Sequence, residues 1–188
     1  MISGIINKFD TSAIEFVHSL HNNFNYLDYF FSLVTNMGEA LFLGAVIIAF
    51  LIFKKTRLCG INMAIGCFAA FIITAVILKP LIARERPFFN IQYYDYWVAV
   101  GKHIETSFSC PSSHATLSFA VYFPMFLYFN KLYSFLALVI ALIISFSRVY
   151  LMVHYASDVI FGAFIGLIVS SVVYIIINKN IRLFYRFI

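Results

Sequence analysis

Five long apolar runs dominate the chain and restrict how it can fold. Spanning the hydrocarbon core of a bilayer takes roughly 20 apolar residues, with a range of about 17–25. Two runs meet this length comfortably, and the two shortest would need flanking residues or a locally thinner bilayer. Because backbone polar groups cannot bond to water inside lipid, such runs predict transmembrane helices. The runs cover about Met37–Phe53, Leu58–Leu78, Ala115–Phe129, Leu132–Phe146 and Val159–Ile177.

Composition favours a membrane protein over a soluble one. Of the 188 residues, 63% are hydrophobic and 11% are charged, with a mean hydropathy of +0.93; a water-soluble domain would need more polar surface. We therefore expect an all-α integral membrane protein, a multi-pass bundle of about five transmembrane helices surrounded by the lipid bilayer. The net charge of +5 is scattered rather than clustered, so nucleic acid is not an expected partner. The sequence carries no signal for an oligomeric state.

The cysteines and the first ten residues limit the expected class of protein further. Cys59, Cys67 and Cys110 are odd in number and lack the spacing of zinc ligands, so neither a disulfide framework nor a zinc site is expected. The first ten residues lack the charged start and apolar core of a cleavable signal.

The first 36 residues differ from the apolar runs because polar residues interrupt them. Apolar residues recur every three or four positions from Ile14 to Val34, with Glu15 and Asp28 between them. This pattern predicts an amphipathic interfacial helix, opened by a capping box at Ser12 and broken near residues 21–23. The alternative is a sixth span, but burying two carboxylates in hydrocarbon is costly. The chain is thus expected to divide into an N-terminal interfacial segment, 1–36, and a transmembrane domain, 37–188.

Charged residues between the runs indicate which side of the membrane each loop faces. With five spans, basic residues divide almost evenly between the two sides, but all eight acidic residues fall on one side. The side with only basic residues is predicted to be cytoplasmic, in the cell (inner) membrane. The opposite side, extracytoplasmic or periplasmic, would then hold two long polar segments, residues 79–114 and 147–158.

Four cations lie at the ends of spans in these polar segments: Lys79, Arg84, Arg86 and Arg148. Taken singly, each would be an ordinary anchor to lipid headgroups. Gathered on one face, they repel each other and require an anion, and phosphate fits because guanidinium groups bind its oxygens in a bidentate manner. A divalent cation beside four positive charges is electrostatically unfavourable, so we expect neither a metal nor another cofactor.

Two histidine motifs accompany these cations. The segment from Pro111 to His114 has the proline and hydroxyl residues typical of a helix start, whose N–H groups favour an anion, although an ordinary cap would look the same. His154 and Asp158 are four residues apart, so in a helical turn they share one face. A carboxylate on one imidazole nitrogen fixes the tautomer and leaves the other nitrogen free to react. A metal-binding His–Asp pair is the alternative.

Together these motifs resemble the three-part signature of the type-2 phosphatidic acid phosphatase superfamily. Their order, internal spacing and placement at the ends of apolar runs all agree with it. Vanadium haloperoxidases have similar anion-binding motifs, but they are soluble enzymes, and the apolar spans argue against that role. The matching residues read Lys79-x6-Arg86-Pro87, Pro111-Ser112-Ser113-His114 and Ser147-Arg148-x5-His154-x3-Asp158.

The resemblance implies a mechanism and a role for each residue. His154 would attack phosphorus and form a phosphohistidine, Asp158 would orient His154, and His114 would protonate the departing lipid oxygen. The remaining site residues would bind the phosphate, through their cationic side chains or through N–H groups at the helix start: Lys79, Arg86, Arg148, Ser112 and Ser113.

Two positions depart from the family pattern or lie outside it. The family usually has glycine where Ser113 stands, and a Cβ there would disfavour a positive φ and crowd the approach of backbone to phosphate. Serine still supplies an N–H and a hydroxyl, so we expect activity to survive. Arg84, inside the first motif's variable stretch, either adds to the phosphate clamp or pairs with Glu85.

The expected substrate is a membrane lipid phosphate, with no choice made among undecaprenyl diphosphate, phosphatidylglycerophosphate, phosphatidate and lipid A phosphates. Aromatic residues between Pro87 and Cys110 form either a plain interfacial belt or a lid over the phosphate site, with Lys102 and His103 available to a second phosphate. The expected activity is hydrolysis. The alternatives are a lipid phosphotransferase and a non-catalytic lipid-phosphate binder or transporter.

Overall fold

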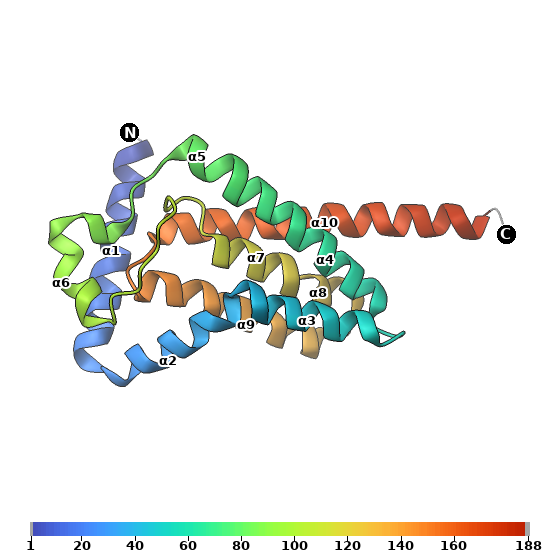
Figure 1. Cartoon of the computed structure of the whole chain (residues 1–188), viewed down its shortest axis with the longest axis horizontal. Helices are drawn as coiled ribbons and strands as arrows, with labels where there is room; N and C mark the ends of the chain where they lie inside the picture. The colour runs from blue at the N-terminus through green and yellow to red at the C-terminus, as the bar shows by residue number, and fades with distance from the viewer. Residues whose placement is uncertain (1, 187–188) are drawn as a thin grey trace.

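The computed structural model describes residues 2–186, with side chains for residues 4–179, and all regular structure in this part of the chain is helical. The five apolar runs become helices that lie side by side in an elongated bundle (Figure 1). The apolar runs were the strongest signal in the sequence, and each of them is helical in the structure. The predicted all-α membrane fold class is therefore confirmed. The bundle consists of α3 (Ala40–Ile52), α4 (Arg57–Phe71) with the π-helical stretch η2 (Ile72–Leu78), α7 (Ser113–Tyr122) with α8 (Pro124–Tyr128), α9 (Lys131–Tyr150) and α10 (Ala156–Arg186).

The helices of the bundle differ in whether they are long and apolar enough to span a membrane. Three stretches in the described chain are long and apolar enough: Arg57–Phe89, Lys131–Tyr150 and Ala156–Lys179. A fourth span results if Tyr26–Gly38 and Ala40–Ile52, bent by 55°, cross together. At about 1.5 Å per residue, neither α7 nor α8 alone reaches across hydrocarbon about 30 Å thick, so a fifth span through both stays a prediction.

The short helix α7 lies in the middle of the bundle. It packs against α4, α9 and α10, and seven of its ten residues are buried. Gly162 and Gly166, one turn apart on α10, let the two helices approach closely: a Cβ at Gly162 would lie 2.6 Å from the carbonyl oxygen of Ser112. Small residues at this spacing are typical of close helix packing in membranes. The contact fixes the start of α7 against the start of α10.

The N-terminal segment forms two helices with different placements. The first, α1 (Ile2–Asn23), crosses one end of the bundle (Figure 1), as an interfacial helix would. The predicted capping box is wrong, because α1 already begins at Ile2 and Ser12 lies inside it. The second, α2 (Tyr26–Thr35), follows a break at residues 24–25 and joins α3 through η1 (Asn36–Gly38). Tyr26–Gly38 forms one arm of the bent pair, so the interfacial placement of residues 26–36 stays a prediction.

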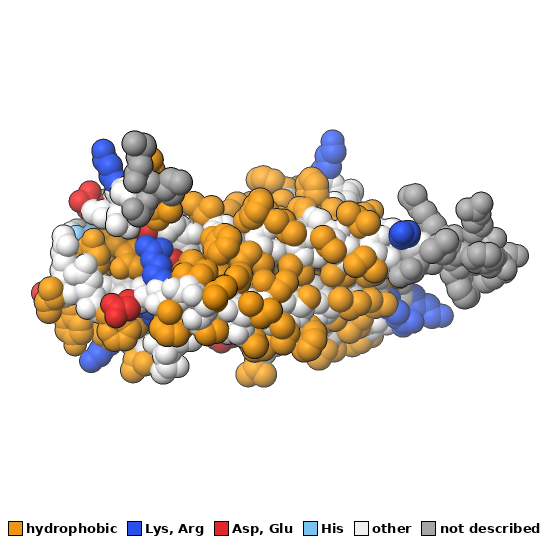
Figure 2. Space-filling view, turned by 90° about the horizontal axis from the view of Figure 1, so that it is seen from above, with side chains coloured by type: hydrophobic (Ala, Val, Ile, Leu, Met, Phe, Trp, Pro, Cys, Tyr) orange, Lys and Arg blue, Asp and Glu red, His pale blue; other side chains and the backbone are white. Residues whose placement is uncertain are grey.

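On the face drawn in Figure 2, most charged side chains lie toward the two ends of the bundle, and apolar side chains cover most of the surface between them. Lys54 and Lys55 are exposed in the turn between α3 and α4, which lies at the end of the bundle far from α1 (Figure 1). The acidic side chains visible in Figure 2 lie toward the opposite end, where α1 crosses the bundle, together with Lys and Arg side chains. The five-span arrangement predicts Arg182 and Arg186, which follow the last apolar run, on the side with only basic residues, but both lie outside the residues whose side chains are described.

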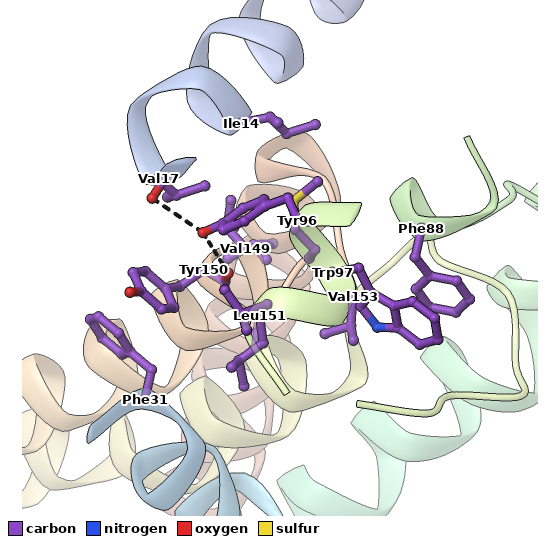
Figure 3. Packing of buried hydrophobic residues seen from close by; sticks show 14 residues of the cluster. Ile14, Val17, Phe31, Phe88, Tyr96, Trp97, Val149, Tyr150, Leu151 and Val153 are labelled. Carbon is purple, nitrogen blue, oxygen red and sulfur yellow. Dashed lines mark hydrogen bonds between the residues drawn. The ribbon is translucent and has the colours of Figure 1, made fainter. Parts of the chain in front are cut away.

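Aromatic residues of α6 (Ile91–Ala99) attach α1 to the bundle. The Tyr96 hydroxyl lies 3.1 Å from the carbonyl oxygens of both Val17 in α1 and Tyr150 in α9 (Figure 3). Trp97 stacks on Phe88 of η3 (Pro87–Phe89), with ring centroids 4.6 Å apart. Tyr96 and Trp97 are buried, so they belong to the core rather than to a lipid-facing belt.

Candidate active site

The predicted site residues lie at the end of the bundle where α1 crosses. Lys79 opens α5 (Lys79–Ile82), Ser112 and Ser113 begin α7, and Arg148 lies in the last turn of α9. His154 lies in the turn between α9 and α10 rather than within a helix, and Asp158 follows in the first turn of α10. The backbone N–H of Ser112 donates to the carbonyl oxygen of Asp158 at 3.1 Å, which joins the second motif to the third.

His154 is 1% exposed and lies between a carboxylate and a cation. Its Nδ1 is 3.8 Å from Oδ2 of Asp158, and its Nε2 is 3.3 Å from the guanidinium of Arg86. Arginine is always a donor, so Nε2 presents its lone pair and the proton of the neutral ring resides on Nδ1. Burial lowers the pKa of His154 well below its usual value; Asp158 opposes this, and Arg86 and Arg148 reinforce it. The ring is therefore neutral at neutral pH.

Ser109 completes the surroundings of this pair. Its hydroxyl donates to Oδ2 of Asp158 at 2.6 Å and lies 3.4 Å from Nδ1 of His154. The N–H of Tyr155 reaches the same carboxylate oxygen at 3.0 Å. Sequence reasoning missed Ser109, although it stands two residues before the Pro111–His114 motif and could have been suspected on that ground.

The three predicted phosphate-binding cations share neighbours. Lys79 donates to the Ser107 hydroxyl and the Phe108 carbonyl, both at 2.8 Å. Arg86 reaches the same hydroxyl at 3.2 Å, and also donates to the carbonyl of Val153 at 2.8 Å. All three cationic residues, Lys79, Arg86 and Arg148, are buried. Their charges are therefore held in place by the loop before α7.

Glu105, which the sequence analysis did not single out, occupies the space between two of these cations. One carboxylate oxygen pairs with Arg148, and the other lies 3.5 Å from Arg86. Arg148 also donates to the Thr35 hydroxyl at 2.6 Å. A carboxylate held by two guanidinium groups has the charge and bidentate geometry of a bound phosphate oxygen pair. A phosphate that binds Arg86 and Arg148 must displace it.

His114 faces the bend between η1 and α3. Its Nε2 lies 3.2 Å from Oε1 of Glu39, and a Cβ at Gly38 would meet the imidazole at 2.7 Å. Burial lowers the pKa of His114, whereas the hydrogen bond to Glu39 opposes this shift. Sequence reasoning also missed Glu39, which lies in a segment with no motif.

Ser112 and Ser113 occupy the cap and the first residue of α7. The first backbone hydrogen bond within α7 is donated by the Thr116 N–H to the carbonyl oxygen of Ser112. The N–H groups before Thr116 therefore have no acceptor within the helix. Ser113 is helical, and the positive-φ non-glycine residues among those described are Ala83, Lys102 and Met152. The expected conformational penalty of serine in place of glycine therefore does not arise.

Arg84 does not pair with Glu85, which was one of its two expected roles. Its guanidinium donates to Asp158 at 2.6 Å and to Asp10 of α1 at 2.7 Å, and lies over the Tyr155 ring. The second expected role, in the phosphate clamp, stays a prediction: these contacts hold Arg84 against Asp158, and Arg84 also lines the cleft beside Lys79 and Arg86. Asp10 was missed because it lies 74 residues from Arg84 in sequence.

Lys102 and His103 each contact a residue that is not one of the predicted phosphate ligands. The Lys102 ammonium lies 5.8 Å from the Trp97 ring centre, and Nε2 of His103 is 3.0 Å from the Ser32 hydroxyl. Where side chains are described, His, Cys, Asp and Glu do not gather in groups of three as metal ligands would.

A cleft of about 670 Å³ opens beside the cations. Its polar wall includes Lys79, Arg86 and Ser113, and its apolar wall includes Phe71 and Ala75 of the α4–η2 stretch. The cleft therefore joins a cationic wall to a stretch that is long and apolar enough to span a membrane, as a ligand with a charged head and an apolar tail requires.

These features define a membrane-embedded helical protein with a cationic, histidine-containing site. Residues 60–182 match the PAP2 superfamily, which is more than half of the chain. The chain belongs to the PAP2 superfamily, and the resemblance to type-2 phosphatidic acid phosphatases is confirmed.

Sequence relatives carry several phosphatase names. The chain is 29% identical over 158 residues to a lipid A 4'-phosphatase of Porphyromonas gingivalis, covering 79% of this chain and 65% of the relative. It is 34% identical over 116 residues to an undecaprenyl-diphosphatase of Sulfolobus acidocaldarius, covering 62% and 54%. Phosphatidylglycerophosphatase B of Bacillus subtilis is 30% identical over 154 residues, covering 74% and 70%. The matches thus span less than two thirds of the length of the first two relatives.

Solved structures show the same fold. A PAP2-type phosphatidylglycerolphosphate phosphatase from Bacillus subtilis superposes with a TM-score of 0.72 at 24% identity, covering 95% of this chain and 87% of that one. Aquifex aeolicus LpxE superposes with a TM-score of 0.66 at 22% identity, covering 85% and 93%. At these identities the likeness concerns the fold.

Proposed function

We propose that this chain is an integral membrane lipid phosphatase that hydrolyses a phosphomonoester or diphosphate lipid through a phosphohistidine on His154. The observation that carries the proposal is the neutral His154 ring, whose Nε2 lone pair faces Arg86 beside the cleft. A phosphate that displaces Glu105 from Arg86 and Arg148 would place its phosphorus near that nitrogen. Membership of the PAP2 superfamily and the names of its relatives support the same reaction class.

In the first step, Nε2 of His154 attacks phosphorus and the bond from phosphorus to the lipid oxygen breaks. Lys79, Arg86 and Arg148 stabilise charge on the non-bridging oxygens, the role that magnesium has in kinases. His114, protonated on the nitrogen now shared with Glu39, delivers its proton to the departing oxygen. Asp158 stabilises the positive charge that develops on the His154 ring.

In the second step, water attacks the phosphohistidine. His114, left neutral by the first step, takes a proton from this water, the bond between Nε2 and phosphorus breaks, and inorganic phosphate leaves. Both histidines then return to their starting states. Transfer to a second lipid would follow the same course with a lipid hydroxyl in place of water, and mass spectrometry of the lipid products separates the two reactions.

The non-catalytic alternative loses the feature that favoured it. Ser113 was the one departure from the family pattern that argued for binding without turnover. Its backbone is helical, and its side chain lines the cleft beside Lys79 and Arg86. A binder would hold the lipid phosphate without releasing inorganic phosphate, so the same assay also separates these two functions.

The substrate class follows from the cleft and from the relatives. An apolar wall beside the cations suits a phosphate attached to a long hydrocarbon chain. The relatives are named for lipid A, undecaprenyl diphosphate and phosphatidylglycerophosphate. We place the site on the extracytoplasmic side of the cell membrane, because the α3–α4 turn at the opposite end (Figure 1) exposes Lys54 and Lys55 and holds no carboxylate.

The test is release of inorganic phosphate by the purified protein in detergent micelles containing EDTA. The panel comprises undecaprenyl diphosphate, phosphatidylglycerophosphate, phosphatidate and lipid A. We expect turnover of at least one lipid, and loss of about a thousandfold or more in His154→Ala, because the nucleophile is removed. His18→Ala is the matched control, since His18 is an exposed histidine of α1.

Two results would overturn the proposal. Full turnover in a folded His154→Ala protein would exclude His154 as the nucleophile. Absence of phosphate release across the whole panel, with tight lipid binding retained, would favour the binder.

A further inference from the structure

The buried carboxylate of Asp10, on the N-terminal helix α1, contacts residues next to Asp158 in the candidate active site. Asp10 is 2% exposed, although α1 lies at the edge of the molecule. Ile5, Ile6 and Phe9 of the same helix are exposed. α1 therefore presents an apolar face outward and directs Asp10 toward the bundle, where Ile14 and Val17 also pack (Figure 3).

Asp10 has three hydrogen-bond donors, all from the immediate surroundings of Asp158. One oxygen accepts from the backbone N–H of Ser157 at 2.8 Å. The other accepts from the Ser157 hydroxyl and from Arg84, both at 2.7 Å. Ser157 is the second residue of α10, so Asp10 satisfies one of the N–H groups that the start of α10 leaves free. A carboxylate so fully bonded is a fixed charge.

Arg84 connects this carboxylate to Asp158. Its guanidinium bridges the two aspartates, at 2.7 Å to Asp10 and 2.6 Å to Asp158. Two carboxylates and one guanidinium leave a net charge of −1 in the cluster. Without Asp10, Arg84 would neutralise Asp158 alone, and little negative charge would remain to support a positive ring on His154.

We propose that Asp10 is a positioning residue of the active site, which holds Arg84 and the first turn of α10 so that Asp158 keeps its negative charge directed at His154. This makes α1 part of the catalytic unit, although it lies outside the family match at residues 60–182. The inference rests on the proposed function only for its kinetic readout. It revises the expected division at residue 36, because the N-terminal segment supplies a side chain that the site requires.

Other charged groups near the pair remain in place when Asp10 is changed. Arg86, Arg148 and Asp158 act directly on His154. Tyr93 lines a pocket together with Asp10 and Arg84. Two further titratable groups beside them are Tyr155 and Cys110, and burial raises the pKa of both. They are therefore uncharged at neutral pH, and the Asp10 substitution alters only one charge in this cluster.

The decisive variant is Asp10→Asn, which keeps the size of the side chain and removes its charge. The cluster then becomes neutral, so protonation of His154 becomes less favourable and the ring becomes a weaker nucleophile. We expect kcat to fall about tenfold, with a smaller change in KM. The acid limb of the kcat/KM profile should move to lower pH. Glu15→Gln, an exposed carboxylate on the same helix, removes an equal charge and should match the wild type.

A second measurement does not depend on turnover. NMR of histidine-labelled protein in micelles follows the titration of His154, assigned with His154→Ala. We expect the midpoint to lie about 0.5–1 pH unit lower in Asp10→Asn than in the wild type, since one nearby charge is lost. Asp10→Ser, which also removes the charge while keeping an acceptor for the Ser157 N–H, replaces Asp10→Asn if the latter does not purify as a folded protein.

The outcomes separate this inference from the proposed function. An unchanged His154 titration in the folded Asp10 variant overturns the positioning role, even if the wild type is an active phosphatase. A shifted titration supports it, even if the wild type releases no phosphate and the proposed function fails. A loss of kcat with neither pH limb nor titration moved would show a purely structural role for Asp10, and would also overturn the inference.

Discussion

At the scale of single residues, Glu105 decides whether the cations are available to substrate. Its carboxylate lies between Arg148 and Arg86, where the proposed mechanism places phosphate oxygens. Each binding event must therefore exchange one anion for another. The net affinity for phosphate is the difference between the binding of phosphate and the binding of Glu105 by Arg86 and Arg148. Tighter binding of Glu105 therefore weakens the affinity for phosphate.

The substitution Glu105→Gln should strengthen inhibition by vanadate, which resembles phosphate in charge and shape. Glutamine keeps a similar size and one acceptor oxygen but carries no charge, so the inhibitor no longer competes with a carboxylate. We expect the inhibition constant of vanadate to fall about tenfold. The measurement is vanadate inhibition of lipid phosphate hydrolysis at fixed pH.

The matched control for this change is Asp95→Asn. Asp95 is exposed on α6 and belongs to the same polar segment before α7. Its loss alters the net charge equally but leaves Arg86 and Arg148 as they are. Equal effects of the two substitutions would show that net charge, not displacement of Glu105, governs inhibition.

Glu39 should control the pH range in which His114 can act as an acid. The hydrogen bond from His114 to Glu39 favours the protonated ring and opposes the lowering of the His114 pKa by burial. Removing the charge in Glu39→Gln lowers that pKa further. His114 then loses its proton at a lower pH, so the basic limb of kcat should move to lower pH, measured by steady-state kinetics across the range. A shift to higher pH would contradict this role.

At the scale of secondary-structure elements, the packing of α7 on α10 holds two motifs together. The N–H of Ser112 bonds to the carbonyl of Asp158, and Gly166 lies one turn beyond Gly162 along the same interface. At Gly166, an added Cβ would collide with the Thr116 carbonyl oxygen and would lie 2.8 Å from Cβ of Phe119. Backbone atoms of two packed helices cannot yield as the end of a flexible side chain can.

Gly166→Ala should therefore destabilise the protein by about 1–3 kcal/mol, the usual cost of overpacking, and lower activity by separating Ser112 from Asp158. Thermal unfolding in detergent measures the first effect, and phosphate release measures the second. Gly44→Ala on α3 is the control, because no atom lies within 4 Å of its added Cβ. That change should be neutral or slightly stabilising, since alanine is the better helix former. If both variants unfold alike, close packing at Gly166 is not the cause.

The elements that sequence could predict are those coded by local patterns. Apolar runs gave the bundle helices, and motif spacing placed His154, Asp158 and the start of α7 at one end. The third run was harder, because Pro124 begins a separate helix, α8, and splits the run in two. The capping box at Ser12 failed because helical pattern continues N-terminal to it, and a local motif does not fix where a helix begins.

The missed residues are those whose partners lie far away in the chain. Glu39 contacts His114 across 75 residues, Asp10 contacts Arg84 across 74, and Arg148 reaches Thr35 across 113. These contacts exist only because α1 crosses the bundle and the α2–α3 pair bends at the site. Neither arrangement follows from hydrophobic periodicity, which reports the face of a helix but not its neighbours. The expected pairing of Arg84 with Glu85 was wrong for this reason, since Glu85 is its nearest carboxylate in sequence but Asp10 and Asp158 are its partners in the structure.

At the scale of the whole molecule, the two ends of the bundle differ in charge and chemistry. One end carries α1 and the candidate site with its histidines and carboxylates, and the other carries the α3–α4 turn with the exposed Lys54 and Lys55 (Figure 1). Basic loops are retained in the cytoplasm during insertion. If the basic end is cytoplasmic, the apolar face of α1 lies in the outer interface, and Asp10 connects the site to the outer leaflet from which substrate would enter.

This orientation predicts which positions a membrane-impermeant maleimide can label in intact spheroplasts. Lys102→Cys, in the exposed loop at the site end, should react from outside. Lys55→Cys, in the turn between α3 and α4, should react only after the membrane is permeabilised, because the reagent cannot cross lipid. The wild type measures the background from Cys59, Cys67 and Cys110, none of which is fully exposed. The opposite labelling pattern would place the site on the cytoplasmic side, and the lipid phosphate it meets would then belong to the inner leaflet.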